Sequence, residues 1–331
     1  MRSFVDTEEN ERSRRRRSGW LRPTIRLAVG VGLISFLISR SDISAIKQAL
    51  AGANPLLIMA SYSLSIGLVV ASAFRWRIFL EALEVDLSIP SILRLTFVGA
   101  FFNAFLPTGV GGDAYKAFRV RTTNTTLATS FASVLLDRVA GIAMLAILGF
   151  LAAVTAIRSD ITPLVLMGLA LSVGVLALAT SVLLMGQNLV GGGRRTWFGI
   201  RPRIRRALDA AARAIRRPST IRRSFMIGVV CQAFGIAAYA TLAHSLGLGI
   251  PLEVVTLGLL SATVVSAIPI TINGLGIREA VWVWGLSIYG IAQGRALAYA
   301  LLVLGVSLAT SAVGGLVYAV AGGDVAVQEG T

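Results

Sequence analysis

The chain consists of long apolar runs separated by short basic segments, and this pattern leaves few folds open to it. Of its 331 residues, 55% are apolar and 14% are charged, whereas soluble domains contain about 25% charged residues. A helix needs about 20 apolar residues to cross the hydrocarbon core of a bilayer, so this length allows about eight crossings with their loops. The sequence therefore predicts an all-α polytopic membrane protein with about eight transmembrane segments.

The distribution of charge predicts the orientation of the N-terminus. The net charge is +15, and the arginines lie between apolar runs, which is the pattern of a membrane protein rather than of a nucleic-acid partner. The tail 1–22 contains four consecutive arginines, Arg14 to Arg17, and precedes the apolar run 27–38. The positive-inside rule keeps such a tail in the cytoplasm. A cleaved signal peptide is the alternative, but no small-residue cleavage site follows, so an uncleaved signal anchor is favoured.

Further apolar runs predict the remaining segments. They cover residues 55–74, 89–106, 139–157, 163–185, 225–246, 252–270, 280–291 and 297–320. Arg75 and Arg77 are expected to end the first of these runs at the cytoplasmic interface, and Asp137-Arg138 is expected at the boundary of the third. A short amphipathic piece, 43–50, is expected to lie on the outer surface.

The run 89–106 is predicted to form a hairpin rather than a full crossing. It is followed directly by Lys116, Arg119 and Arg121. A full crossing would place these three cations outside, against the positive-inside rule. The sequence therefore favours a hairpin that enters the membrane from the cytoplasm and returns to it.

The basic segment 191–223 separates two membrane halves. It contains eleven arginines and one acidic residue, and its apolar residues recur every three or four positions. This spacing predicts an interfacial helix on anionic lipid headgroups, with a solvated basic loop as the alternative. The expected organisation is a basic tail (1–22), a first membrane half (23–190) with a break at 106–113, the basic segment (191–223), a second half (224–321) with a break at 268–279, and a tail (322–331).

The two breaks have the same order of residue types. The stretches 106–113 (LPTGVGGD) and 268–279 (IPITINGLGIRE) each contain a proline, two glycines spaced i, i+2, and then an acidic residue. Proline removes a backbone donor and glycine permits sharp turns. Such backbone persists in hydrocarbon only where protein, water or a ligand satisfies it. Matching breaks in the two halves predict a pair of re-entrant or broken helices around a binding site.

The chemistry of the breaks suits an anionic headgroup. Free N–H groups at a helix start attract anions, and Arg278 offers a planar fork of donors to a phosphate. Asp113 remains open as a helix cap, Arg278-Glu279 as an interface pair, and Asp137-Arg138 as a mere boundary marker. The expected substrate-binding residues are Asn103, Pro107, Gly109, Gly111, Gly112, Asp113, Lys116, Asp137, Arg138, Pro269, Asn273, Gly274, Gly276, Arg278 and Glu279.

The sequence offers little for catalysis. Cys231 and His244 are the only cysteine and histidine, so a disulfide framework, a thiolate metal site and a histidine cluster are excluded within this chain. No catalytic residue, metal or cofactor is predicted. An enzymatic activity is therefore not favoured, although the sequence leaves the question open.

The residues of the two breaks carry a resemblance to a known family. The order Asn103-x-x-Leu-Pro-x-Gly-x-Gly-Gly-Asp113, then Asp137-Arg138, then Gly274-x-Gly-x-Arg-Glu279, resembles the lysylphosphatidylglycerol synthase transmembrane region. This is the flippase-like membrane domain of multiple peptide resistance factors and of stand-alone bacterial and archaeal proteins. The resemblance covers about Arg22 to Val320 and implies a lipid-handling fold in a prokaryotic plasma membrane. The soluble aminoacyl-transfer domain of the longer relatives is missing here, so that activity is not expected.

Two positions depart from the family pattern. Asp137 stands where the family often has glutamate, and Lys116 is the nearest cation where it often has arginine. The loss of a bidentate phosphate contact is therefore expected at the first break.

The expected function is transport of an amphiphile between leaflets. The resemblance and the breaks favour a flippase-like protein for a phospholipid or a polyprenyl-phosphate-linked sugar. The alternative is a membrane accessory subunit of a separate glycosyltransferase or lipid synthase, with 191–223 as its docking surface. A transferase with its active site in the bilayer is the third hypothesis, and the lack of matched acid/base residues argues against it.

Overall fold

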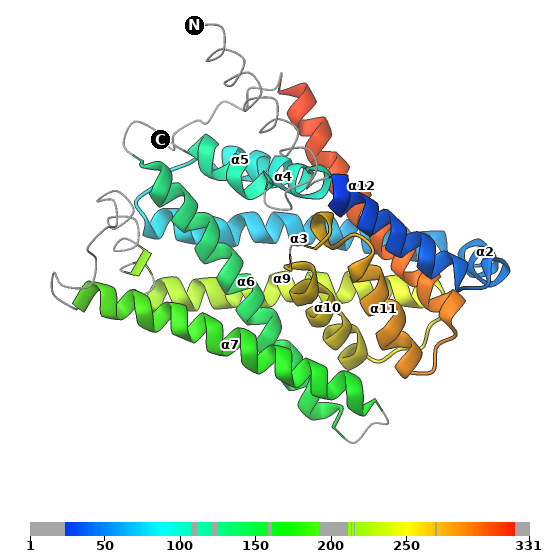
Figure 1. Cartoon of the computed structure of the whole chain (residues 1–331). Helices are drawn as coiled ribbons and strands as arrows, with labels where there is room; N and C mark the ends of the chain where they lie inside the picture. The colour runs from blue at the N-terminus through cyan, green and yellow to red at the C-terminus, as the bar shows by residue number, and fades with distance from the viewer. Residues whose placement is uncertain are drawn as a thin grey trace, which may run out of the picture.

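Helices form all the regular structure that the computed structural model describes (Figure 1). The described residues are 24–106, 111–120, 125–157, 161–191, 211–212, 214, 216–268 and 270–321. Among them, five helices are long and apolar enough to cross a membrane, or six if the bent pair Thr24–Ser39 and Ile43–Ala51 forms one span. The all-helical membrane fold is confirmed, with five or six full-length spans where the sequence predicted about eight segments that include two re-entrant or broken helices.

Each of the five long helices contains a continuous apolar stretch. They are α3 (Pro55–Ala82), α6 (Leu127–Thr155), α7 (Thr162–Gly191), α9 (Pro218–Ser245) and α12 (Gln293–Val320). Asn54 caps the start of α3 by accepting hydrogen bonds from Leu56 N and Leu57 N, and Pro55 occupies the first turn, where its missing N–H is not needed. Large apolar side chains remain exposed along these helices, Leu56 and Leu178 among them, as expected for surfaces that face lipid.

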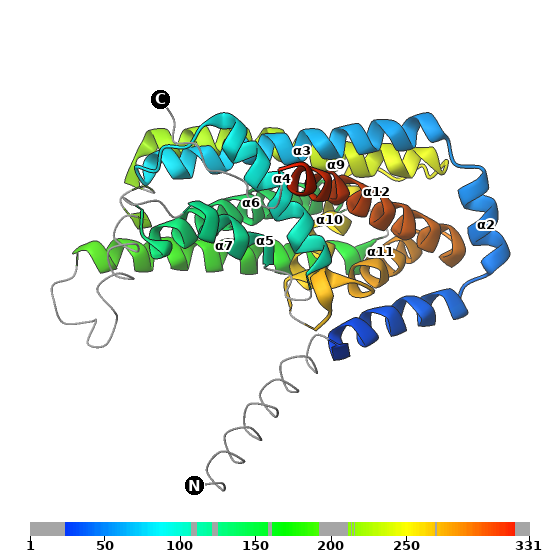
Figure 2. The same cartoon turned by 90° about the horizontal axis from the view of Figure 1, so that it is seen from above.

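The helices α3 and α9 run antiparallel along each other (Figures 1 and 2). At one end Asn54 N donates to Ser245 O at 2.8 Å, and further along Ser61 Oγ donates to Ala238 O at 2.8 Å. At the other end Arg223 forms an ion pair with Glu81 at 3.0 Å. Each helix of this pair is followed in the chain by a shorter helix, so the pair positions the start of both shorter segments.

Four shorter helices form two hairpins. The first hairpin consists of α4 (Ile89–Phe105) and α5 (Gly111–Val120), and the second consists of α10 (Leu252–Ser266) and α11 (Ile277–Ile288). In the first hairpin, Gly99 lies against the side chain of Lys116, and the side chain of Asn103 is hydrogen-bonded to Gly112 N. In the second, Gly258 contacts the ring of Trp282 and Ser266 contacts Gly274. The described residues of both predicted breaks therefore lie where the two helices of a hairpin meet.

The two hairpins begin at opposite ends of the α3–α9 pair. The first follows the C-terminal end of α3 and the second follows the C-terminal end of α9, and these two helices are antiparallel. The helix order also repeats: α3-α4-α5-α6 has 28, 17, 10 and 29 residues, and α9-α10-α11-α12 has 28, 15, 12 and 28. This arrangement is that of an inverted structural repeat.

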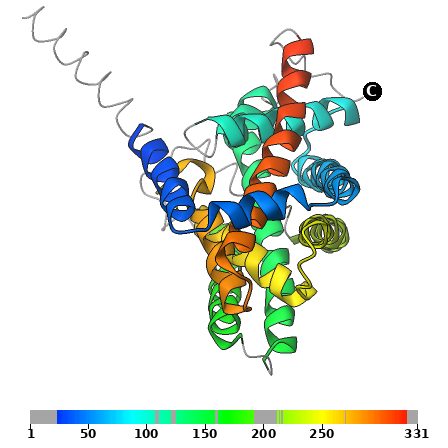
Figure 3. The same ribbon diagram turned by 90° about the vertical axis from the view of Figure 1, so that its right-hand side faces the viewer.

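The helix α2 (Ile43–Ala51) crosses one end of the bundle (Figure 3). It is bent by 93° from the helix Thr24–Ser39. Asp42 caps it by accepting a hydrogen bond from Ser44 N at 2.8 Å, and Gly294 at the start of α12 allows close contact with Ala45. The amphipathic piece predicted at 43–50 is therefore a separate helix at the end of the bundle.

Two helices extend beyond the apolar runs that predicted them. The helix α3 does not stop before Arg75 but continues to Ala82, and α6 passes through Asp137-Arg138 without interruption. The reason is that Arg75 and Asp137 bind each other at 2.7 Å, so neither charge has to leave the bundle.

Aromatic residues organise the core between the second hairpin and its neighbours. Trp282 of α11 stacks on Tyr239 of α9 and meets Tyr299 of α12 edge to face, with ring centroids 5.6 and 5.2 Å apart. Tyr299 Oη donates to Tyr239 O at 3.2 Å. A second core cluster surrounds the fully buried Trp76 beneath the first hairpin. The first hairpin thus packs on the indole of Trp76, whereas the second contributes its own indole, Trp282, to the core.

Gly112→Ala is expected to destabilise the fold by about 1–3 kcal/mol, the usual cost of overpacking. A Cβ at Gly112 would overlap the carbonyl oxygen of Gly99, so α4 and α5 would have to separate. Thermal unfolding in detergent measures the effect. Gly174→Ala is the control, because a Cβ there meets nothing within 4 Å. Equal unfolding temperatures for the two variants would contradict the close packing of the hairpin.

Some predicted features lie outside the described residues. These are the tails 1–22 and 322–331, most of the basic segment 191–223, and the candidate site residues Pro107, Gly109 and Pro269. The end of the basic segment is described, and Pro218 to Arg223 form the first turns of α9.

Candidate functional site

The tip of the first hairpin is fastened by Asn103. Its Oδ1 accepts a hydrogen bond from Gly112 N at 2.8 Å, and its Nδ2 donates to Asp113 Oδ1 at 3.3 Å. Asp113 lies in the first turn of α5, which begins at Gly111. The open interpretation of Asp113 as a helix cap was wrong, because this residue is inside the helix.

Asp113 holds Arg138 of α6 through two hydrogen bonds. Arg138 Nε and Nη2 each donate to the carboxylate at 2.9 Å. The Asp113 side chain is 16% exposed, whereas that of Arg138 is 50% exposed. The pair therefore connects the buried tip of the first hairpin to the surface of α6.

Arg75 and Asp137 form a second, buried pair between α3 and α6. Arg75 Nε donates to Asp137 Oδ1 at 2.7 Å, and both side chains are at most one-tenth exposed. Gly141 leaves room for the guanidinium, because a Cβ there would lie 2.8 Å from Arg75 Nη2. The adjacent Trp76 donates from Nε1 to Ser133 Oγ at 3.2 Å, which locks α3 on α6.

Lys116 of α5 is buried without an anionic partner. The residue is only 8% exposed, and its ammonium group lies 4.6 Å from the centroid of the Trp76 ring. No carboxylate of the described residues is within ion-pair distance of it, although it interacts electrostatically with the two pairs above. Together Arg75, Asp113, Lys116, Asp137 and Arg138 form a charge cluster whose three cations and two carboxylates leave one positive charge uncompensated.

The tip of the second hairpin depends on left-handed backbone. Asn273, Gly274 and Gly276 have φ angles of 49°, 75° and 81°, a region that glycine adopts at little cost. A Cβ on Gly276 would lie 2.6 Å from the carbonyl oxygen of Gly30. Glycine is therefore required twice over at Gly276, for its conformation and for the approach of the helix Thr24–Ser39.

Glu279 and Arg278 follow this turn. Glu279 is 1% exposed, and its Oε2 accepts a hydrogen bond from Gly276 N at 2.6 Å, so the carboxylate caps α11. Arg278 Nε donates to Glu279 Oε1 at 3.4 Å. The Arg278 side chain is 16% exposed, and its remaining N–H groups have no acceptor among the described residues. The guanidinium thus keeps most of its donors available.

Three buried polar atoms of the second hairpin also lack a partner among the described residues. They are Thr271 Oγ1 at the tip, Ser261 Oγ on α10 and Trp282 Nε1 on α11. Buried polar groups are normally hydrogen-bonded, and leaving one unsatisfied costs about 1–3 kcal/mol. The second hairpin therefore carries several groups that a polar ligand or water would satisfy.

The structure brings the predicted residues into two groups. Asn103, Gly111, Gly112, Asp113, Lys116, Asp137 and Arg138 surround the first tip, and Asn273, Gly274, Gly276, Arg278 and Glu279 form the second. The sequence interpretation missed Arg75 and Trp76. The available signal was that the apolar residues Ile78, Phe79 and Leu80 follow them, which favours continuation of the helix.

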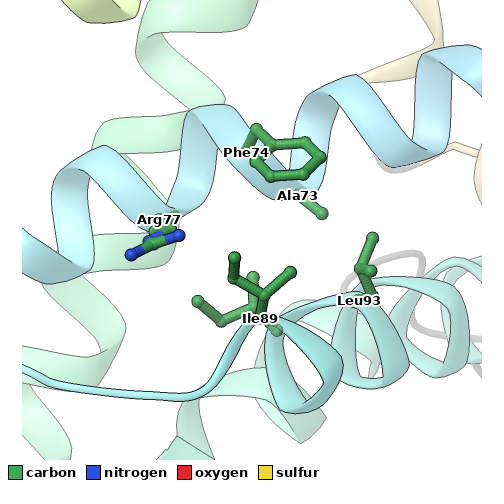
Figure 4. Close-up of a pocket in the computed structure, with 6 residues that line it drawn as sticks. Ala73, Phe74, Arg77, Ile89 and Leu93 are labelled. Carbon is green, nitrogen blue, oxygen red and sulfur yellow. The ribbon is translucent and has the colours of Figure 1, made fainter. Parts of the chain in front are cut away.

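An apolar crevice between α3 and α4 is separate from these groups (Figure 4). It is lined by Ala73, Phe74, Arg77, Ile89, Ile92 and Leu93 and encloses no space that a water molecule could fill. Arg77, its one charged residue, is paired with Glu81 at 2.7 Å. The crevice is too small for a lipid headgroup and offers it no free charge.

Comparisons with known proteins agree with a membrane-domain assignment. The model of the family described as the lysylphosphatidylglycerol synthase TM region matches residues 24–315. The UPF0104 membrane protein of Methanothermobacter thermautotrophicus is 28% identical over 137 residues, which cover 41% of this chain. The match spans only 38% of that relative's length.

Proposed function

This chain belongs to the lysylphosphatidylglycerol synthase TM region family, and on that premise we propose that it moves an amphiphile with an anionic headgroup between the leaflets of a membrane. The substrate class comprises phospholipids and polyprenyl-phosphate-linked sugars. The observation that carries the proposal is that two hairpins begin at opposite ends of the α3–α9 pair and that each tip holds an incompletely satisfied cation.

The chemistry of the tips supports a headgroup ligand. A cation within the membrane is expensive and usually marks a substrate pathway. The starts of α5 and α11 add the positive ends of two helix dipoles at the hairpin tips. Lys116 provides a point charge for a phosphate, and Arg278 provides a fork of donors. The headgroup binds at these tips while its tails remain in the lipid.

The inverted order of the halves supports alternating access. With six spans and the tail 1–22 in the cytoplasm of a prokaryotic cell, the segment 191–223 also lies in the cytoplasm, as the positive-inside rule requires. The first hairpin then enters from the cytoplasm and the second from outside. Exposure of the tips to one side at a time transfers the headgroup. The driving force is a gradient, the membrane potential or downhill flow of the lipid.

Transfer in proteoliposomes tests the proposal. Purified protein is reconstituted with a fluorescent phosphatidylglycerol, and an impermeant reductant quenches the label in the outer leaflet. The active protein is expected to expose the inner-leaflet label as well, which protein-free vesicles protect. If the inner-leaflet label stays protected for every lipid tested, while a partner enzyme copurifies and requires the segment 191–223, the accessory-subunit hypothesis replaces transport.

A further inference from the structure

We infer that the charge cluster of the first hairpin selects a ligand with a single negative charge, a phosphodiester headgroup that arrives from the bilayer beside Arg138. This inference rests on the proposed function and specifies its substrate class. It begins with the composition of the cluster, in which Arg75 pairs with Asp137 and Arg138 pairs with Asp113.

Those two pairs leave the positive charge of Lys116 alone. The ring of Trp76 at 4.6 Å attracts the ammonium, but a cation–π contact does not neutralise it. A buried charge without a counter-ion is strongly unfavourable. A ligand with one negative charge neutralises the surplus positive charge of the cluster. A ligand with two negative charges would give the cluster a buried net negative charge.

A phosphodiester meets this requirement. It carries one negative charge and has two unesterified oxygens that accept hydrogen bonds, whereas a phosphate monoester carries about −1.5 to −2 at pH 7. Lys116 suits one oxygen as a point charge. Arg138 uses Nε and Nη2 for Asp113, so its Nη1 can donate to the other oxygen while the ion pair stays intact.

The surface around Arg138 indicates the direction of approach. Phe131, Leu135 and Arg138 lie at i, i+4 and i+7 on one face of α6, and all three side chains are exposed. Phe118 of α5 is 58% exposed and its ring meets Phe131 at 5.9 Å. An exposed apolar face on helices of this kind is covered by acyl chains. Arg138 therefore lies at the border between the lipid tails and the charge cluster.

The second hairpin does not share this charge selection. Arg278 and Glu279 balance each other, so the second hairpin has no surplus charge for an anion to neutralise and would contact a phosphate through the remaining hydrogen-bond donors of Arg278. Discrimination by charge therefore belongs to the first hairpin, and Lys116 is the residue that determines it.

Transfer of two lipids in the same proteoliposomes tests the inference. Wild-type protein is expected to transfer labelled phosphatidylglycerol at least about tenfold faster than labelled phosphatidic acid at pH 7. The ratio is expected to decrease at pH values below about 6, where the monoester loses its second charge. Lys116→Met should lose phosphatidylglycerol transfer at least about tenfold, whereas Lys116→Arg keeps the charge and the preference. Asp113→Asn adds one surplus positive charge and should shift the preference toward phosphatidic acid.

The outcomes separate this inference from the proposed function. Equal transfer of both lipids by the wild-type protein, or full phosphatidylglycerol transfer by a folded Lys116→Met variant, overturns the inference and leaves transport standing. No transfer of any lipid by the wild-type protein overturns both. If Lys116→Met fails to fold, the wild-type ratio and Asp113→Asn still decide, because a ratio of one or an unshifted preference contradicts charge matching.

Discussion

Arg278→Ala is expected to abolish lipid transfer while the helices remain folded and inserted. The Arg278 guanidinium has donors left after its contact with Glu279. Each hydrogen bond to a charged group contributes roughly 1.5–3 kcal/mol, so losing two of them slows transfer about 100-fold or more. The rate of inner-leaflet quenching in proteoliposomes measures this loss. The turn should persist, because Gly276 N keeps its bond to Glu279.

Two further variants make this result specific. Arg222→Ala removes an exposed arginine at the start of α9 and is expected to leave transfer unchanged, which controls for net charge. Arg278→Lys keeps the charge but not the fork, so it should recover part of the rate. Normal transfer by Arg278→Ala would eliminate Arg278 as a headgroup ligand.

Asp137→Ala is expected to destabilise the folded protein by about 3–5 kcal/mol, the usual effect of leaving one partner of a buried ion pair alone. Arg75 is less than one-tenth exposed and has Asp137 as its bonded carboxylate. Lys116 and Arg138 interact with the same carboxylate, so its removal leaves three cations with one acid. Thermal unfolding in detergent measures the loss.

A double variant and a surface control test the cause. Arg75→Leu combined with Asp137→Leu removes both charges and should recover most of the stability, because an apolar pair often replaces a buried ion pair without loss. Asp86→Ala removes an exposed acid from the loop before α4 and should change stability by less than about 0.5 kcal/mol. An Asp137→Ala variant as stable as the wild-type protein would show that the pair does not hold α3 on α6.

The features that the sequence predicted are those set by local chemistry. Long apolar runs predicted the helices, and prolines and paired glycines predicted both breaks, because backbone hydrogen bonding decides each of them within a few residues. The described residues of the two stretches adjoin the two hairpins, one in each half of the chain. The antiparallel contact of α3 and α9 then adds what no local pattern contains, namely that the hairpins begin at opposite ends.

The partners of the charged residues were not predictable in this way. Arg75 and Asp137 are 62 residues apart, and the sequence pattern places Arg75 at the end of one span and Asp137 at the start of another, without indicating a partner for either. Asp113 and Arg138 were both identified as candidates, but their bidentate pairing depends on how α5 packs on α6. These pairings leave Lys116 without an anionic partner. That surplus charge is found only when the charged residues of α3, α5 and α6 are considered together.

The central claim is that the two hairpins enter the membrane from opposite sides. Thiol labelling on sealed vesicles tests it with Asp86→Cys, before the first hairpin, and Gln293→Cys, after the second, each in a Cys231→Ser background. Both positions are exposed. An impermeant maleimide should label Asp86→Cys in inverted vesicles and Gln293→Cys in right-side-out vesicles. Labelling of both positions from the same side would contradict the inverted repeat and, with it, transport by alternating access.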